Sequence, residues 1–334
     1  MHAPDGFLNA GTAVATGAVS AGALGASLRQ MRSTLKDKQV PLAGLSAAFI
    51  FAAQMFNFPV AAGTTGHLLG GALAAVLLGP FTGAVVVAVV VVVQAFAFAD
   101  GGLTALGYNV LNMAVVTAFG GYGMFRLTRR VLPVNATGVV VATGIAAGLS
   151  VPLSAMAFAI EWLFGATAPV PFDTVFGAMV GVHLLIGIGE GVISALAVGA
   201  VLAARPDLVQ GAADLRRDQL AERPPIGMRG FVLGAGLVAV VFAAVVSQFA
   251  APDPDGLERV AGDEGFIASA QEHALAGGPF ADYATQGLGN ETVSLAVAGI
   301  VGVVLTLLVG LGVVYAVRDR RARTSRTSTP AGTG

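Results

Sequence analysis

The first two residues of the chain, Met1 and His2, offer a metal-binding group of their own. A free terminal amine, the backbone amide of residue 2 and the His2 imidazole supply three nitrogens that close fused chelate rings on one ion. Such an array favours planar coordination, which suits Ni(II) or Cu(II) and disfavours Mg(II) or Ca(II). Many chains have a histidine at position 2 by chance. The dipeptide therefore supports a metal site only together with a further ligand.

His67 can supply a fourth nitrogen. It ends the segment Gly63-Thr64-Thr65-Gly66-His67, in which the glycines let the backbone approach a ligand closely. The chain has no cysteine, so a transition-metal site must use nitrogen or oxygen donors. The sequence therefore predicts a square-planar site of Met1, His2 and His67. The alternative is that His67 is no ligand but a single polar residue at a membrane interface.

Other polar residues are candidates for holding or gating these ligands. Asn109 and Asn112 are three residues apart and share a predicted helix face, where hydrogen bonds between membrane helices are the commoner role. The complete set of candidates is Asp5, Asn57, Thr64, Thr65, Asn109 and Asn112.

Two ionisable residues lie within one predicted membrane helix. His183 and Glu190 are seven residues apart and therefore share a helix face. Ionisable groups inside a membrane are functional candidates because their burial is costly. We favour a structural role for Glu190.

The composition indicates a membrane protein. Of the 334 residues 55% are apolar and 11% are charged, against about 25% charged in soluble domains. The net charge of −1 excludes a basic nucleic-acid-binding domain, and the absence of cysteine excludes a disulfide-rich secreted one. The sequence has neither a P-loop motif nor an H-E-x-x-H motif, which argues against P-loop ATP binding and a zincin protease.

Apolar stretches of about 20 residues predict membrane-spanning helices. We expect an all-α polytopic protein of about nine spans, seven followed by two. The third span is short, and the break at Gly79-Pro80 leaves open a re-entrant or broken segment beside a full span. The expected ranges are 8–28, 41–61, 66–79, 82–99, 103–125, 135–160, 174–203, 229–250 and 293–317.

Charge placement predicts the topology. All basic residues except Arg259 fall in alternate connections and in the tail, and positive residues gather in cytoplasmic loops. The N-terminus is then outside and the C-terminus inside. The first basic residue, Arg29, comes too late for a cleavable signal peptide, so we expect the native start to be retained.

The chain divides into four expected regions. Residues 1–204 form a membrane core that carries the candidate site, and residues 205–228 form a cytoplasmic loop. Residues 229–317 contain two spans around an acidic external loop at 251–292. Residues 318–334 form a basic tail, which we expect to be disordered and cytoplasmic.

The opening Met1-His2-Ala3-Pro4-Asp5-Gly6-Phe7-Leu8 resembles the start of the CbiM/NikM family, the substrate-binding components of energy-coupling-factor transporters for cobalt and nickel. Further matches follow in order at residues 62–71, at Asp100-Gly101-Gly102-Leu103 with Asn109 and Asn112-Met113, and at His183 with Gly189-Glu190-Gly191. Pro254-Asp255-Gly256-Leu257-Glu258 resembles the PDGLE motif of the small partner CbiN/NikN. The chain thus resembles a fusion of the larger component, over 1–204, with the smaller, over 229–317.

The resemblance implies a metal site made from the Met1 amine, the amide and imidazole of His2, and His67. The sequence departs from the family's opening motif at Ala3, where the family often has Ile. We expect this difference to affect packing more than metal ligation. The resemblance also implies partners: a CbiQ-like transmembrane coupling subunit and CbiO-like P-loop ATPases in the cytoplasm. Cobalt and nickel members share these motifs.

We therefore predict a multi-pass cell-membrane component for ATP-driven uptake of Ni(II) or Co(II), which links it to cobalamin biosynthesis. It is not an enzyme, and we expect no organic cofactor and no nucleic acid. One alternative is an ion-coupled secondary transporter that uses His183 and Glu190 as a proton relay. Another is a membrane sensor or assembly protein whose acidic external region binds a partner.

Overall fold

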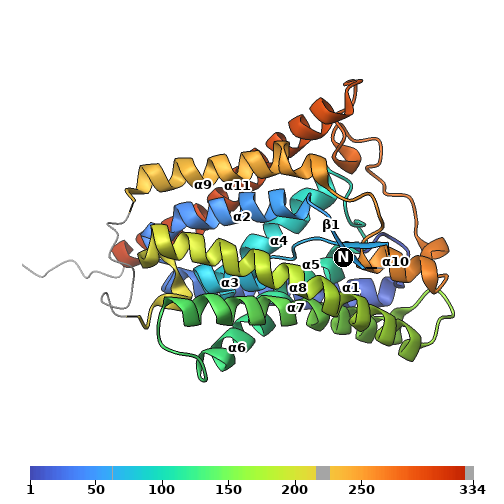
Figure 1. Cartoon of the computed structure of the whole chain (residues 1–334), viewed down its shortest axis with the longest axis horizontal. Helices are drawn as coiled ribbons and strands as arrows, with labels where there is room; N and C mark the ends of the chain where they lie inside the picture. The colour runs from blue at the N-terminus through green and yellow to red at the C-terminus, as the bar shows by residue number, and fades with distance from the viewer. Residues whose placement is uncertain (62, 216–225, 328–334) are drawn as a thin grey trace, which may run out of the picture.

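The computed structural model describes residues 1–61, 63–215 and 226–327 and shows a helical bundle whose long helices run along one axis (Figure 1). In these residues seven helical segments are long and apolar enough to cross a membrane, which agrees with a multi-pass membrane protein. They are α1 (Ala10–Thr34), α4 (Pro80–Ala97), α5 (Leu106–Val110) continued by a π-helical turn (Leu111–Val116) and α6 (Thr117–Arg129), α7 (Ala136–Gly165), α8 (Phe172–Ala204), α9 (Met228–Ala244) with a 3₁₀ turn (Val246–Phe249), and α11 (Glu291–Thr327).

Two of the expected spans correspond to shorter helices. The segment expected at 66–79 contains α3 (Gly71–Leu78), whose eight buried residues extend only about 12 Å along a helix. Gly70 and Gly79 bound α3 with φ of 81° and 87°, a backbone conformation that favours glycine. The broken alternative therefore describes this segment. The helix α2 (Val40–Gln54) has 15 residues, so nine spans remain a prediction.

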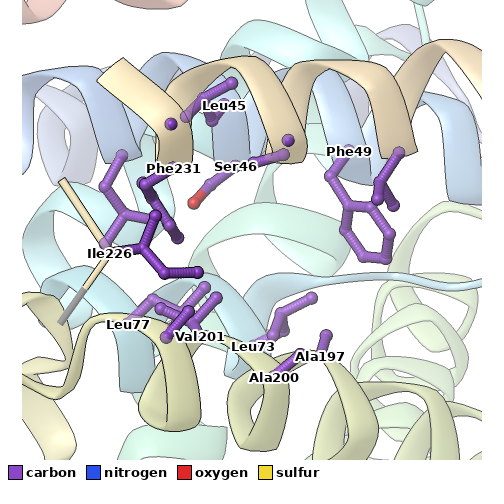
Figure 2. A pocket seen from close by; sticks show the side chains of 16 residues that line it. Leu45, Ser46, Phe49, Leu73, Leu77, Ala197, Ala200, Val201, Ile226 and Phe231 are labelled. Carbon is purple, nitrogen blue, oxygen red and sulfur yellow. The ribbon is translucent and has the colours of Figure 1, made fainter. Parts of the chain in front are cut away.

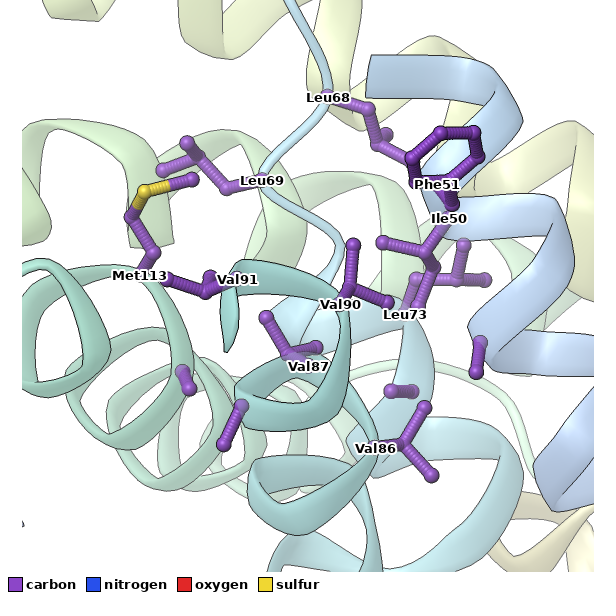
Figure 3. Packing of buried hydrophobic residues seen from close by; sticks show 14 of the residues in the cluster. Ile50, Phe51, Leu68, Leu69, Leu73, Val86, Val87, Val90, Val91 and Met113 are labelled. Atoms are coloured by element: carbon purple, nitrogen blue, oxygen red, sulfur yellow. The ribbon is translucent and has the colours of Figure 1, made fainter. Parts of the chain in front are cut away.

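The apolar core lies around α4, which explains its long run of valines. Ile50 and Phe51 of α2, Leu73 of α3 and Val90 of α4 are among the buried residues that pack together in Figure 3. A helix surrounded by other helices is apolar on all sides rather than on one stripe. The valine run therefore reflects the central place of α4.

Ion pairs join several polar connections at one end of the bundle. Lys38 lies 3.2 Å from Asp207, and Arg129 lies 3.0 Å from Asp214. These connections are ones that the charge pattern assigns to a common side. The N-terminus lies away from this end, beside the labels of β1 and α10 in Figure 1. Which side of a membrane each end faces remains a prediction, and Arg216, Arg217 and Arg223 lie outside the described residues.

The expected external loop at 251–292 forms a folded layer over the N-terminus. It contains α10 (Gly256–Asp263) and 3₁₀ turns at Ile267–Ser269 and Ala281–Tyr283. It also docks on an antiparallel hairpin of β1 (Phe58–Ala61) and β2 (Thr64–Gly66). The amide of Thr65 donates to the carbonyl of Pro254 at 2.9 Å, and its hydroxyl donates to the carbonyl of Asp253 at 2.9 Å.

The C-terminal tail differs from expectation. Helix α11 continues to Thr327, although the sequence analysis places a disordered tail from Arg318 onward. Arginine and alanine favour helix, so the residues after Arg318 extend the helix that precedes them. Residues 328–334 lie outside the described part of the chain.

Glycine contacts set the spacing of α7 and α8. A Cβ atom added to Gly187 lies 2.3 Å from the carbonyl oxygen of Gly148, and one added to Gly191 lies 2.6 Å from that of Gly144. The two backbones therefore touch, as small residues permit between membrane helices.

We expect Gly187→Val to force α7 and α8 apart and to lower the stability of the protein by about 1–3 kcal/mol. Unfolding of the purified protein in detergent measures this loss. Gly181→Val is the matched control, because nothing lies within 4 Å of a Cβ at that position of α8. Equal losses in both variants would contradict the close packing.

Candidate metal site at the N-terminus

The N-terminal segment is held inside the protein by hydrogen bonds that resemble strand pairing. The side chain of Asn109, in α5, accepts from the Ala3 amide at 2.9 Å and donates to the Ala3 carbonyl at 2.9 Å. The Gly102 amide also donates to the Ala3 carbonyl, at 3.0 Å. Met1 and Ala3 are buried. Asn109 therefore fixes the position of the first three residues.

Asp5 anchors the same segment to the loop before α5. Its buried carboxylate accepts hydrogen bonds from the amides of Leu103, Thr104 and Ala105 at 3.2, 2.7 and 3.2 Å. The Thr104 hydroxyl donates to it at 2.6 Å. A Cβ atom on Gly102 would lie 2.2 Å from the Asp5 amide, so glycine permits this approach.

His67 follows β2 in a loop that Glu190 holds from α8. The Glu190 carboxylate accepts from the amides of Leu69 at 2.6 Å and Gly70 at 3.0 Å, directly before α3 begins. An anionic group at a helix N-terminus satisfies free amides and interacts favourably with the helix dipole. Nδ1 of His67 donates to the Leu68 carbonyl at 3.0 Å, which leaves the lone pair on Nε2.

These elements bring Met1, His2 and His67 together. The Met1 amine directly contacts Nε2 of His67. The imidazole rings of His2 and His67 stack, with centroids 5.1 Å apart and planes inclined by 22°. The three residues that the sequence analysis chose as ligands therefore lie together at one place in the structure.

A carboxylate from the C-terminal region completes this cluster. Oδ2 of Asp255 lies 2.6 Å from the Met1 nitrogen and 3.6 Å from Nε2 of His67. Burial alone would raise the pKa of Asp255, but the terminal ammonium holds that pKa well below its usual value. The carboxylate is therefore negatively charged beside the nitrogens.

His2 is neutral at pH 7. Burial lowers the pKa of its imidazole to about 4, against the opposing charge of Asp100. A neutral imidazole keeps one nitrogen lone pair, which metal binding requires.

A cavity of about 680 Å³ is lined by His2, His67, Asp100, Asp255 and Tyr283, among others. A second cavity, of about 370 Å³, lies between α2, α3, α8 and α9 (Figure 2). Its wall is almost wholly apolar, with Ser46 the one polar side chain shown there. Metal chemistry is therefore available only at the first of these two cavities.

Within the described ranges, no three His, Cys, Asp or Glu side chains are grouped so that they could hold a metal ion. A metal at the first cavity would therefore need donors besides the side chains of these four residue types. The terminal amine and the backbone amide of His2 are such donors.

Three of the candidate supporting residues lie along the β1–β2 side of the site. Thr65 binds the segment before α10, as described above, and Thr64 is buried in β2. Asn57 lines the first cavity, and its carbonyl accepts from the Ala251 amide at 2.8 Å. All three lie where the N-terminal and C-terminal regions of the chain meet.

Asn112 has a different place from Asn109. Its Nδ2 donates to the buried carboxylate of Glu161 at 2.7 Å, and its carbonyl accepts from the Ser154 hydroxyl at 2.9 Å. The π-helical turn begins at Leu111, between the two asparagines, and changes the helical period there. The two asparagines therefore bond to different partners, and Asn112 joins helices, as the sequence analysis gives as the commoner role.

His183 and Glu190 do not form a pair. Glu190 binds the loop after His67, while Nδ1 of His183 donates to the Met179 carbonyl at 2.7 Å. Nε2 of His183 has no hydrogen-bond partner in the part of the chain that the structure describes. The arrangement favours a structural role for Glu190 and gives no support to a proton relay between the two residues.

The sequence analysis did not assign a site role to Asp255. The Asp-Gly-Leu-Glu spacing predicts a helix N-cap, and Oδ1 of Asp255 does accept from the Glu258 amide at 2.9 Å. Its other oxygen reaches Met1, which no local pattern indicates. The sequence analysis also gives no role to Gln94 and Asp100, which lie beside His2, or to Tyr283, which bonds to both of them.

Comparison with known proteins gives a consistent result over the whole chain. The CbiM family, described as "Cobalt uptake substrate-specific transmembrane region", matches residues 2–208, and the PDGLE domain matches residues 229–319. A "Putative fused nickel transport protein NikMN" of Archaeoglobus fulgidus is 35% identical, over 97% of this chain and 100% of that protein. The "Fused nickel transport protein NikMN" of Rhodobacter capsulatus is 31% identical, over 96% and 100%.

A solved structure is also similar. The crystal structure of a truncated transition metal transporter has 33% sequence identity to this chain and a TM-score of 0.53. The match covers 60% of this chain and 98% of that one.

We expect Glu190→Gln to destabilise the protein by about 1–3 kcal/mol, because the amide offers one acceptor oxygen to the two buried amides of Leu69 and Gly70. The free energy of unfolding in detergent measures this effect. Glu272→Gln, at an exposed position of the external layer, should change nothing. A Glu190→Gln protein as stable as the wild type would show that the carboxylate does not hold the His67 loop.

Proposed function

The chain belongs to the CbiM family and carries a C-terminal PDGLE domain, and we propose from this that it is the substrate-binding membrane component of an uptake transporter for Ni(II) or Co(II). Its relatives are named as transport proteins, which fits a transport component rather than an enzyme. The single observation that carries the proposal is the meeting of the Met1 amine, His2 and Nε2 of His67 beside a cavity that both histidines line.

In the proposed site four nitrogens surround the metal. The Met1 amine and the His2 amide close a five-membered ring, and the His2 amide and Nδ1 of the same residue close a six-membered ring. His67 supplies Nε2 from the remaining side, next to the amine that it already contacts. Four nitrogens in a plane suit Ni(II), which agrees with the nickel names of the two fused relatives.

The charge of Asp255 fits this assignment. Binding replaces one proton on the terminal amine and one on the His2 amide, so the peptide contributes one negative charge to a dication. The Asp255 carboxylate, 2.6 Å from the amine, supplies the second negative charge. A neutral assembly is the favourable one in a partly buried site of low dielectric.

We place metal capture at the extracytoplasmic face and release toward the cytoplasm. Two separate units carry the ligands: Asn109 and Asp5 hold Met1 and His2, while Glu190 holds the His67 loop. A displacement of these units against each other removes one ligand from a chelate that tolerates little distortion. Residues 1–204 would form the metal-binding core and residues 229–317 the region that covers it, joined by the loop 205–228.

The energy for that displacement must come from partners. The sequence contains no P-loop motif. We propose a transmembrane coupling subunit and cytoplasmic P-loop ATPases, as in energy-coupling-factor transporters, with the whole assembly in the cell membrane.

Purified protein with its native Met1 should bind one Ni(II) per chain and show the diamagnetism of a square-planar ion. A glycine placed before Met1 moves the amine out of the chelate, and His2→Ala or His67→Ala removes a ligand. Each change should weaken Ni(II) binding by more than the roughly 10–100-fold typical of outer partners. Equilibrium dialysis against a competing chelator measures the affinity.

His273→Ala is the control, because His273 lies in the external layer and not among the residues that line the site cavity. It should bind Ni(II) like the wild type. Unchanged binding after the added glycine or in His2→Ala would refute the N-terminal chelate.

Uptake of labelled Ni(II) into vesicles should require the ATPase partners. Vesicles with the coupling subunit and ATPases should accumulate metal with ATP, and a variant ATPase without its P-loop lysine should abolish accumulation. A proton gradient should not replace ATP. Uptake driven by that gradient in vesicles without ATPase would instead favour the ion-coupled secondary transporter.

A further inference from the structure

The far side of the His2 ring faces a chain of hydrogen bonds that the proposed ligands do not use. Nε2 of His2 lies 3.0 Å from Oε1 of Gln94, in α4. Nε2 of Gln94 donates to the Tyr283 hydroxyl at 3.0 Å, and that hydroxyl donates to Oδ2 of Asp100 at 2.6 Å. Tyr283 comes from the C-terminal region, far from the others in sequence.

The direction of these bonds follows from the groups involved. An ionised carboxylate only accepts, so the Tyr283 hydroxyl donates to Asp100 and has its lone pairs left for Gln94. The Gln94 amide therefore turns its NH₂ toward Tyr283 and its carbonyl oxygen toward His2. That oxygen can only accept, so Nε2 of His2 must carry the proton.

A proton on Nε2 leaves the lone pair of a neutral imidazole on Nδ1. Nδ1 of His2 makes no good hydrogen bond to Asp100, because Oδ1 of Asp100 lies 3.4 Å from it. Nδ1 is also the nitrogen that closes a six-membered ring with the His2 amide. The tautomer favoured by Gln94 is thus the one that the chelate needs.

We propose that Tyr283, whose hydroxyl Asp100 orients, is a positioning residue that acts through Gln94 to hold His2 in its Nε2–H tautomer, with Nδ1 presented to the metal. The inference rests on the proposed function for the role of Nδ1, whereas the tautomer itself is a property of the metal-free protein. Fixing the tautomer of a ligand histidine through its other nitrogen is a general device of metal sites.

The backbone around Tyr283 indicates that its position is enforced. Asp282 and Tyr283 have φ of 52° and 57°, and Ala99, beside Asp100, has φ of 54°. Such left-handed conformations are unfavourable in residues other than glycine and persist where neighbouring contacts impose them. The Asp282 amide donates to the Phe98 carbonyl at 2.9 Å, and the Tyr283 ring stacks on Phe98 at 5.0 Å. These contacts position the Tyr283 hydroxyl next to Gln94.

Tyr283→Phe tests the proposal because it keeps the stacked ring and removes only the hydroxyl. In full-length metal-free protein, ¹⁵N spectra of the His2 ring should show the Nε2–H tautomer alone in the wild type and a mixture in the variant. Ni(II) should bind the variant about 10–100-fold more weakly. Tyr315→Phe, at an exposed position of α11, is the matched control and should leave both measurements unchanged.

The two measurements separate a positioning role from simple docking of the external layer. A lower thermal stability with an unchanged His2 tautomer would overturn the proposal, and so would a changed tautomer with unchanged Ni(II) affinity. A wild-type His2 protonated on Nδ1 would also overturn it. Failure of the wild type to bind Ni(II) would reject the proposed function, while the tautomer comparison would still decide whether Tyr283 controls the ring.

Discussion

The structure depends on keeping a free chain end at one fixed place inside a folded protein. Terminal residues are usually poorly ordered unless other groups hold them. Here the Met1 ammonium is paired with Asp255, and the backbone of Ala3 is paired with Asn109. Asp5 adds further bonds to the amides before α5. The protein thus uses scarce polar side chains to make an N-terminus as well positioned as a core residue.

The C-terminal region takes part in the site itself. Asp255 contacts the terminal nitrogen, and Tyr283 reaches the hydrogen-bond chain that ends on His2. Both residues lie more than 150 positions beyond His67, on opposite sides of α10 in sequence. Fusion of the two regions in one chain makes their meeting intramolecular, which raises the effective concentration of one for the other. A site shared in this way gives a physical reason for the fused arrangement.

The helical bundle needs apolar residues, whereas the candidate site needs polar ones. Valine fills the surroundings of α4, and glycine lets α7 and α8 touch, so most of the bundle offers no polar group. Two of the exceptions have defined partners: Glu190 binds the His67 loop, and Asn112 binds Glu161. Because an unpaired polar group in an apolar interior is costly, these partners fix which loops and helices lie together.

The sequence by itself determined the membrane class, most helix positions and the trio of Met1, His2 and His67. Apolar length and charge are local patterns, and covalent geometry alone allows the proposed chelate between the adjacent residues Met1 and His2. Only the tertiary structure decided the short form of α3, the different partners of Asn109 and Asn112, and the helical start of the tail. It alone placed Asp255 and Tyr283 beside the N-terminus, because contacts between segments 180 or more residues apart leave no periodic trace in either segment.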